Sequence, residues 1–151
     1  MKYLTLLIVV VLASCQSTPE DGHAHNQDGS QVSEDTEIPR VDYTIWTDKT
    51  ELFVEFPVLI VGNTSRFAAH FTVLNQHQPV REGSVTVSLV KGDKGIRHTA
   101  QEPASEGIFK PSIQPLQAGI YQLIFDIETP TLSDRIVIQD IQVFETMDQA
   151  I

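Results

Sequence analysis

The chain has 151 residues, a length that suits one domain with appended segments. Twenty acidic residues against ten basic ones give a formal charge of −10, which argues against nucleic-acid binding, because contacts to phosphate require clusters of Lys and Arg. With a single cysteine, Cys15, the chain cannot form an internal disulfide bond.

The N-terminal segment has the features of a bacterial lipoprotein signal peptide. Lys2 supplies a positive charge, and the apolar run over residues 4–12 is too short for a bilayer, which takes about 20 residues. The sequence Leu12-Ala13-Ser14-Cys15 matches the lipobox: an apolar residue, two small residues and a cysteine. We therefore predict a signal peptide over residues 1–14 and lipidation of Cys15, whose acyl chains would hold the protein on a membrane of the cell envelope, facing the periplasm or the surface. Gln16, where an inner-membrane retention signal often has Asp, favours the outer membrane.

Residues 15–40 are predicted to form a flexible tether. They are rich in small polar and acidic side chains and show no apolar periodicity, so they bury too little surface to offset the entropy of ordering. Within them His23 and His25 stand one residue apart, between Asp21 and Asp28. Imidazoles beside carboxylates bind Cu(II), Ni(II) or Zn(II), which makes His23 and His25 a candidate site for weak metal capture. The alternative is a hydrophilic linker that happens to contain two histidines.

From Val41 onward, alternating apolar and polar residues predict β-strands, as in Leu52, Val54 and Phe56. We expect eight strands over residues 42–47, 51–56, 65–74, 84–90, 95–100, 107–113, 120–128 and 134–144, with a hairpin turn at 92–95 and a bulge near Asp140. No helical stripe competes with them. The pattern predicts an all-β domain over residues 41–146, an immunoglobulin-like antiparallel β-sandwich of about seven to eight strands, followed by a polar tail at 147–151.

The segment before the seventh expected strand adds to this prediction. A turn that contains Ala118 and Gly119 is followed two residues later by Tyr121. We expect the Tyr121 hydroxyl to hydrogen bond back to that turn, as in the tyrosine corner of immunoglobulin-like domains.

The sequence shows no catalytic motif. It lacks a Gly-x-Ser-x-Gly elbow, a phosphate-binding glycine-rich loop and a His-Glu-x-x-His motif, and its cysteine is assigned to lipidation. We therefore predict a protein that is not an enzyme and has no cofactor beyond weakly bound Cu, Ni or Zn. The remaining histidines, His70, His77 and His98, are scattered, and we expect them to be exposed or structural.

Two segments carry a family resemblance: residues 47–56, TDKTELFVEF, and residues 61–72, VGNTSRFAAHFT. Together with residues 82–89, 94–97, 107–109 and 123–128 they resemble the N-terminal domain of periplasmic adaptor (membrane fusion) subunits of RND-type heavy-metal efflux pumps, in the versions of Bacteroidetes-like bacteria. The resemblance covers about residues 43–144. It implies export of copper, silver or other heavy metals beside an inner-membrane pump and an outer-membrane channel. Such adaptors are often lipoproteins with a His-containing segment after the cysteine, consistent with Cys15, His23 and His25.

The chain departs from that family in two ways. A full adaptor continues into barrel, lipoyl and α-helical hairpin domains, which would start near where this sequence stops, so we expect a stand-alone accessory version, a fragment of a split gene or a domain recruited elsewhere. Adaptors that handle metal often rely on methionines, and residues 41–146 contain none.

Three hypotheses follow. The first is a lipid-anchored, non-enzymatic accessory domain of a heavy-metal RND efflux system, which contacts pump or channel components and captures metal weakly through His23 and His25. The second is a structural or interaction lipoprotein of the envelope with no metal role. The third is a binding module for a small ligand, which requires a concave pocket near Trp46 or Tyr121.

Overall fold

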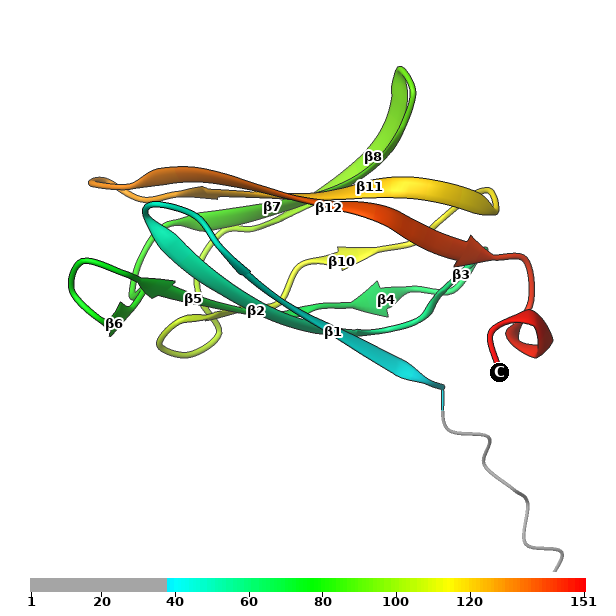
Figure 1. Ribbon diagram of the computed structural model, residues 1–151, viewed down its shortest axis with the longest axis horizontal. Helices are drawn as coiled ribbons and strands as arrows, with labels where there is room; N and C mark the ends of the chain where they lie inside the picture. The colour runs from blue at the N-terminus through cyan, green and yellow to red at the C-terminus, as the bar shows by residue number, and fades with distance from the viewer. Residues whose placement is uncertain (1–37) are drawn as a thin grey trace, which may run out of the picture. The chain divides into compact units, whose positions relative to one another are not determined.

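The computed structural model describes residues 38–151 (Figure 1). They contain twelve β-strands and one turn of 3-10 helix, Met147–Gln149, joined by turns and loops. These residues belong to a compact unit that extends from Asp35 to Ile151. In chain order the strands are β1 (Arg40–Trp46), β2 (Thr50–Pro57), β3 (Leu59–Ile60), β4 (Ser65–Arg66), β5 (Ala68–Val73), β6 (Gln78–Pro79), β7 (Ser84–Lys91), β8 (Lys94–Ala100), β9 (Ile108–Phe109), β10 (Ser112–Ile113), β11 (Gly119–Glu128) and β12 (Ser133–Phe144).

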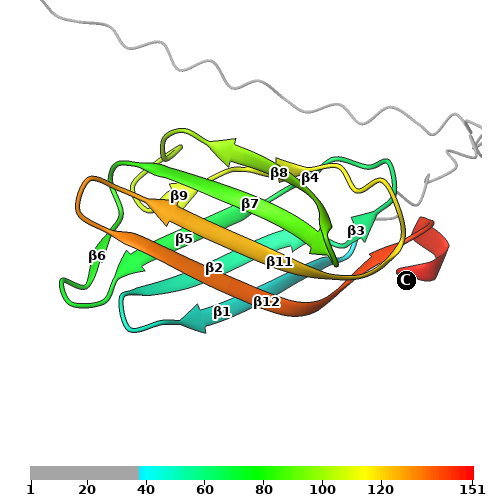
Figure 2. The ribbon, with the colours of Figure 1, turned by 90° about the horizontal axis from the view of Figure 1, so that it is seen from above.

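The strands form two sheets that lie face to face (Figures 1 and 2). The first sheet has the order β1-β2-β5, with β6 and β9 pairing along the other side of β5. The second sheet has the order β3-β12-β11-β7-β8, and the short pair β4–β10 stands apart from both. All pairs are antiparallel except β3 with the end of β12, which is parallel. The predicted all-β, immunoglobulin-like sandwich is therefore confirmed, with this one parallel pair as a correction to a wholly antiparallel arrangement.

The hydrophobic core lies between the two sheets because each long strand alternates buried and solvent-facing residues. Phe67 joins the layers: its ring centroid is 4.7 Å from that of Phe56 and 5.7 Å from that of Phe125 on β11 of the second sheet. Every core residue falls between positions 52 and 143, so the unit carries its own complete core. Its largest fully buried side chains are Phe56, Phe67, Phe71, Phe109, Phe125, Leu52, Leu59, Leu89, Leu123, Ile127, Ile136 and Val54.

The eight expected strands are all present, but two are divided. Residues 65–74 form β4 and β5, which pair with different strands, β10 and β2. Residues 107–113 form β9 and β10, with Pro111 between them. Proline has no backbone N–H to donate, and here its carbonyl instead accepts a bond of 2.9 Å from the N–H of Phe67. The expected polar tail contains the 3-10 turn.

Two local predictions are confirmed. Asp140 has a φ of +56°, and the ladder shifts beside it, since Tyr121 pairs with Ile141 whereas Leu123 pairs with Ile138. This is the expected bulge, and it keeps apolar side chains on the inner face on both sides of the irregularity. The Tyr121 hydroxyl donates to the carbonyl of Gln117 at 2.9 Å, as the tyrosine-corner prediction requires.

A polar connection joins the sheets at the turn between β1 and β2. The Oδ2 atom of Asp134, on β12, accepts hydrogen bonds from the hydroxyls of Thr47 and Thr50, both at 2.6 Å. Lys49, in the same turn, donates through Nζ to the carbonyl of Ser133 at 2.8 Å. These bonds fix the hairpin of β1 and β2 against the second sheet.

The sandwich has two distinct ends. β1 begins where β12 finishes, which we call the terminal end, and the turns β1–β2, β5–β6 and β11–β12 lie at the opposite, distal end (Figures 1 and 2). The pairing of Arg40 with Pro57, and the bond of 2.9 Å from the N–H of Val61 to the carbonyl of Phe144, agree with this placement. Among residues 38–151 no helix has the length and apolar character needed to cross a membrane.

Candidate binding sites

The residues that the sequence singled out for lipidation and metal binding, Cys15, His23 and His25, lie outside the described residues. Their assignments stay predictions. Within residues 38–151 no group of three or more His, Cys, Asp or Glu side chains is arranged so that it could hold a metal ion.

The other three histidines occupy separate places in the fold. His70 lies half-buried on the outer face of β5, with its ring centroid 5.5 Å from that of Phe53. His77 is in the turn between β5 and β6 and has a φ of +52°. His98, on β8, accepts a bond of 3.2 Å at Nδ1 from the N–H of Ser112. The structure does not bring the three together.

β1 is an edge of the first sheet, and among the described strands it pairs with β2 alone. Backbone bonds from Val58 N to Pro39 O and from Thr47 N to Thr50 O, each 2.9 Å, stand at the two ends of the β1–β2 ladder. Because bonded and non-bonded pairs alternate in an antiparallel ladder, the N–H and C=O groups of the even-numbered residues of β1 face away from β2. β1 thus presents a row of donors and acceptors to which an extended segment of another chain can pair.

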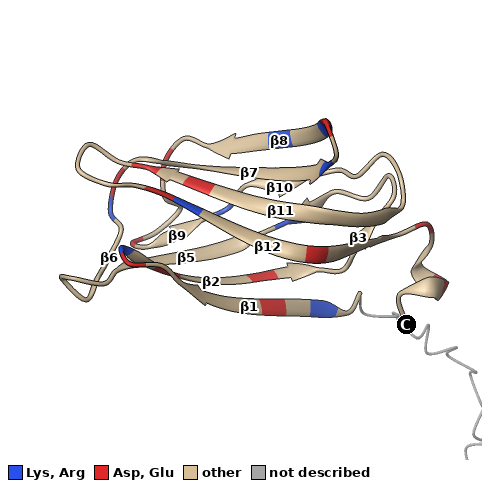
Figure 3. Cartoon of the chain, turned by 45° about the horizontal axis from the view of Figure 1, so that its top comes forward, with Lys and Arg blue, Asp and Glu red and all other residues tan. Residues whose placement is uncertain are grey.

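The outer side chains beside that edge are aromatic and acidic. Trp46, which is 62% exposed, stands opposite Glu51, and Asp42 stands opposite Glu55. Figure 3 shows acidic positions on both β1 and β2. None of these carboxylates belongs to either of the ion pairs found among residues 38–151. Like charges directly across a ladder destabilise a sheet, so the Asp42–Glu55 pair costs folding free energy. We call this surface, with Phe53 and Thr44 between the two pairs, the β1 face.

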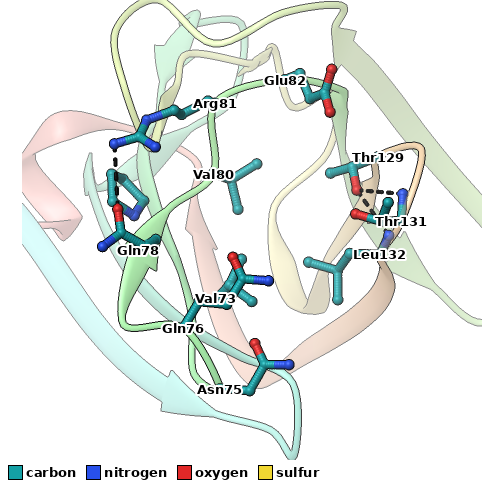
Figure 4. A pocket seen from close by; sticks show the side chains of 11 residues that line it. Val73, Asn75, Gln76, Gln78, Val80, Arg81, Glu82, Thr129, Thr131 and Leu132 are labelled. Carbon is teal, nitrogen blue, oxygen red and sulfur yellow. Dashed lines mark hydrogen bonds between the residues drawn. The ribbon is translucent and has the colours of Figure 1, made fainter.

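A cavity of about 430 Å³ lies at the distal end, between the segment that follows β5 and the β11–β12 turn (Figure 4). Three of the polar side chains that line it, those of Gln78, Arg81 and Thr129, make hydrogen bonds or an ion pair. Arg81 donates to Gln78 at 3.3 Å and pairs with Glu106 at 3.2 Å. The hydroxyl oxygen of Thr129 accepts from the N–H groups of residues 131 and 132.

A second cavity, of about 420 Å³, lies against Tyr121, where the small-ligand hypothesis required a pocket. It forms between the tip of the β7–β8 hairpin and the loop before β11. We call it the hairpin cavity. Its lining residues are Leu89, Lys91, Lys94, Gly95, Ile96, Leu116, Gln117 and Tyr121.

The outer face of the second sheet carries a surface ion pair. Arg135 donates through Nε to Oδ1 of Asp126 at 2.5 Å and through a second guanidinium nitrogen to Oδ2 at 3.1 Å. The hydrogen bond, and then the charge of Asp126, raise the pKa of Arg135 above its ordinary value. Since arginine is protonated at physiological pH in any case, this pair provides no pH switch.

Comparison with protein-family models, with curated proteins and with solved structures found no match.

Sequence reasoning did not find the β1 face or the lysines of the hairpin cavity. The alternation of β1 gives its inner and outer sides but not its place at a sheet edge. The expected hairpin turn at 92–95 contained Lys94, and Lys91 lay directly before it, but neither lysine was assigned a role. The sequence did contain one usable signal for these lysines. Lys91 follows Leu89 by two residues, so it lies on the same, core-facing side of the strand.

Proposed function

We propose that this protein is a lipid-anchored, non-enzymatic accessory domain of a heavy-metal RND efflux system, which acts through protein contacts made by the β1 face and its edge. The observation that carries the proposal is the edge itself. β1 runs the length of the first sheet with one side of its backbone unpaired among the described residues, and its outer side chains include an exposed Trp46. Natural sheets usually protect such an edge, and an unprotected one is a template for a partner strand.

The link to efflux rests on the sequence. The lipobox that ends in Cys15, the His23-x-His25 tether and the adaptor-like segments support it together. The two densest adaptor-like segments, residues 47–56 and 61–72, fold into the β1–β2 turn, β2, β4 and most of β5. They therefore form the part of the first sheet that holds β1 in place.

The geometry suits a protein that is tethered at its N-terminal side. The described domain begins at the terminal end, and β1 extends from there to the distal end (Figure 2). If Cys15 carries the lipid, the predicted flexible tether would join the membrane to the start of β1 and leave the β1 edge free to meet a partner.

Site-specific cross-linking tests the contact. We would place a photoreactive phenylalanine at Thr44, in the middle of the β1 edge, and at Val137, which is 40% exposed on the outer face of the second sheet, as the matched control. We expect pump or channel components to be captured from native membranes by the first variant and not by the second. Capture of those components through Val137 alone would contradict the β1 contact.

A proline substitution tests edge pairing itself. The N–H of Thr44 points away from β2, so Thr44→Pro removes a donor from the free edge and leaves the β1–β2 ladder bonded. Tyr43→Pro, one residue away, breaks that ladder and serves as the control for misfolding. We expect Thr44→Pro to keep the unfolding midpoint within a few degrees and to lose the partner. Full retention of the partner by Thr44→Pro would remove strand pairing from the proposal.

The second candidate is an envelope interaction lipoprotein with no metal role, and the lack of methionine in residues 41–146 favours it. Calorimetric titration with Cu(II), Zn(II) and Ni(II) separates the two, with the His23→Ala/His25→Ala variant beside the parent. Equal heats for both proteins would remove metal capture. Recovery of other envelope proteins, without pump or channel components, from the Thr44 cross-links would favour the second candidate.

A further inference from the structure

We propose that the hairpin cavity is a binding site for a small anionic amphiphile, a carboxylate carried on a short hydrocarbon chain. This inference is independent of the efflux proposal, because it concerns a different surface of the sandwich. The cavity's volume of about 420 Å³ lies in the range of about 300–1,000 Å³ that is usual for small-molecule sites.

The charge of the cavity selects an anion. Lys91 and Lys94 are directly opposed across the β7–β8 ladder, and neither belongs to an ion pair found among the described residues. No carboxylate is among the residues that line the cavity. Two like charges opposite each other destabilise a hairpin. An anion placed between them offsets that cost, in a chain whose formal charge of −10 otherwise repels anions.

Lys91 is held in position by its neighbours. Its ammonium group lies 5.5 Å from the centre of the Tyr121 ring, a cation–π arrangement, and that ring is fixed by the bond from its hydroxyl to Gln117. Gly119 has a φ of +137°, and a Cβ atom there would lie 2.5 Å from Nζ of Lys91. The positive φ is what favours glycine at this position, because the flexible lysine side chain could move away from a Cβ atom.

The remaining lining selects an apolar body. Leu89 and Ile96 pair across the same ladder, one step below the lysines, and form an apolar floor. Leu116, from the loop before β11, is 71% exposed at the cavity. A hydrocarbon chain lying against Leu116 would remove this side chain from water while its carboxylate reached the two ammonium groups.

An inward-facing lysine on an edge strand also discourages strand pairing, so the presence of Lys94 on β8 has a second explanation. That role needs neither a cavity nor an aromatic ring beside the ammonium group of Lys91. These two features favour a ligand site over protection of the sheet edge.

The test uses residues 16–151, which include the whole compact unit and its core, labelled with nitrogen-15. The probe is dodecanoate below its micelle concentration, and the readout is the amide shifts of Gly92, Gly95 and Gly119. We expect saturable shifts at these glycines. Dodecyltrimethylammonium, with the same chain and the opposite charge, should produce none. The absence of saturable shifts with dodecanoate, or equal binding of the two probes, would overturn the proposal.

Two variants separate the site from general electrostatics. Lys91→Gln/Lys94→Gln should weaken dodecanoate binding by about tenfold, since both charge contacts to the carboxylate are lost. Arg97→Gln/Lys110→Gln removes the same charge from positions outside the lining and should change the affinity less than about twofold. An equal loss in both would show non-specific attraction and refute the site.

A third variant, Leu116→Ser, leaves both lysines in place and should weaken dodecanoate without affecting the urea midpoint, because Leu116 is largely exposed. Unchanged affinity in Leu116→Ser would refute the apolar part of the site. Vesicles of phosphatidylglycerol form the last arm. Binding to vesicles, without binding of monomeric dodecanoate, would assign the lysines to a membrane surface and overturn the cavity site.

Discussion

Replacing Asp134 with alanine should lower the free energy of unfolding by about 3 kcal/mol. Its carboxylate accepts hydrogen bonds from Thr47 and Thr50, both at 2.6 Å, and Thr50 is completely buried. Alanine at position 134 removes both acceptor contacts and leaves the Thr50 hydroxyl without its partner where water does not reach. Hydrogen bonds to a charged group contribute about 1.5–3 kcal/mol each, and the low end applies to both because Asp134 is only half-buried.

Two further variants separate the charge from the position. Asp134→Asn keeps a carbonyl oxygen beside the two hydroxyls but loses the charge, and should cost about 1–2 kcal/mol. Asp42→Ala removes an exposed carboxylate from β1 and should change the stability by no more than about 0.5 kcal/mol. Urea unfolding of residues 16–151, followed by circular dichroism, measures all three.

A double-mutant cycle decides whether the loss arises from these bonds. Thr50→Val removes one hydroxyl at nearly constant volume, and its effect combined with Asp134→Ala should fall short of the sum of the single effects by about 1–2 kcal/mol. Strictly additive losses, or an Asp134→Ala variant as stable as Asp42→Ala, would refute the reasoning. The result also bears on the β1 face, because these bonds hold the β1–β2 turn against β12.

Four other substitutions test three separate parts of the fold, each by its urea midpoint. Tyr121→Phe should cost about 1 kcal/mol through loss of the bond to the Gln117 carbonyl, and an unchanged midpoint would contradict the tyrosine corner. Phe67→Ala should cost about 3–5 kcal/mol, because its ring packs against phenylalanines of both layers; a loss near 1 kcal/mol would show that the core collapses around the site. Gly83→Ala should cost about 2 kcal/mol more than Gly62→Ala. Both glycines have positive φ, but a Cβ atom at position 83 would clash with the Glu128 carbonyl, whereas one at position 62 would meet no atom within 4 Å. Equal losses would contradict this reasoning.

The strands were predictable from the sequence because alternation reports which side of a strand is buried. Leu52, Val54 and Phe56 read as one face, and all three are at most 1% exposed. The bulge was predictable for the same reason. Ile138 and Ile141 are three residues apart, and both can face the core only if one extra residue lies between them.

The assignment of strands to sheets was not predictable in the same way. Residues 65–74 keep one pattern of buried and exposed side chains throughout, so they are predicted as a single strand although β4 and β5 pair with different strands. Phe67, at the break, is buried in either arrangement. The parallel contact of β3 with β12 joins segments more than 80 residues apart, and its two residues are too few for a periodic signal.

The candidate sites were the least predictable because they depend on which side chains lack a partner. Trp46 is the only tryptophan, and aromatic residues in an alternating strand usually indicate a core, yet Trp46 faces solvent. Its exposure follows from register: the inner positions of β1 are 41, 43 and 45, and the hairpin turn that starts at Thr47 leaves Trp46 on the outer side.

β1 lies at the margin of the core, against which its inner side chains pack. Its inner side chains, Val41, Tyr43 and Ile45, are only partly buried, whereas the facing residues of β2 are completely buried. The completely buried part of the core therefore ends at β2. β1 pairs along the edge of β2, so the sheet edge that meets solvent is the one with acidic and aromatic side chains. A partner strand can pair with this edge without disturbing any core contact. That separation between a closed core and an open edge is the physical reason to assign protein contacts to β1 and ligand binding to the opposite sheet.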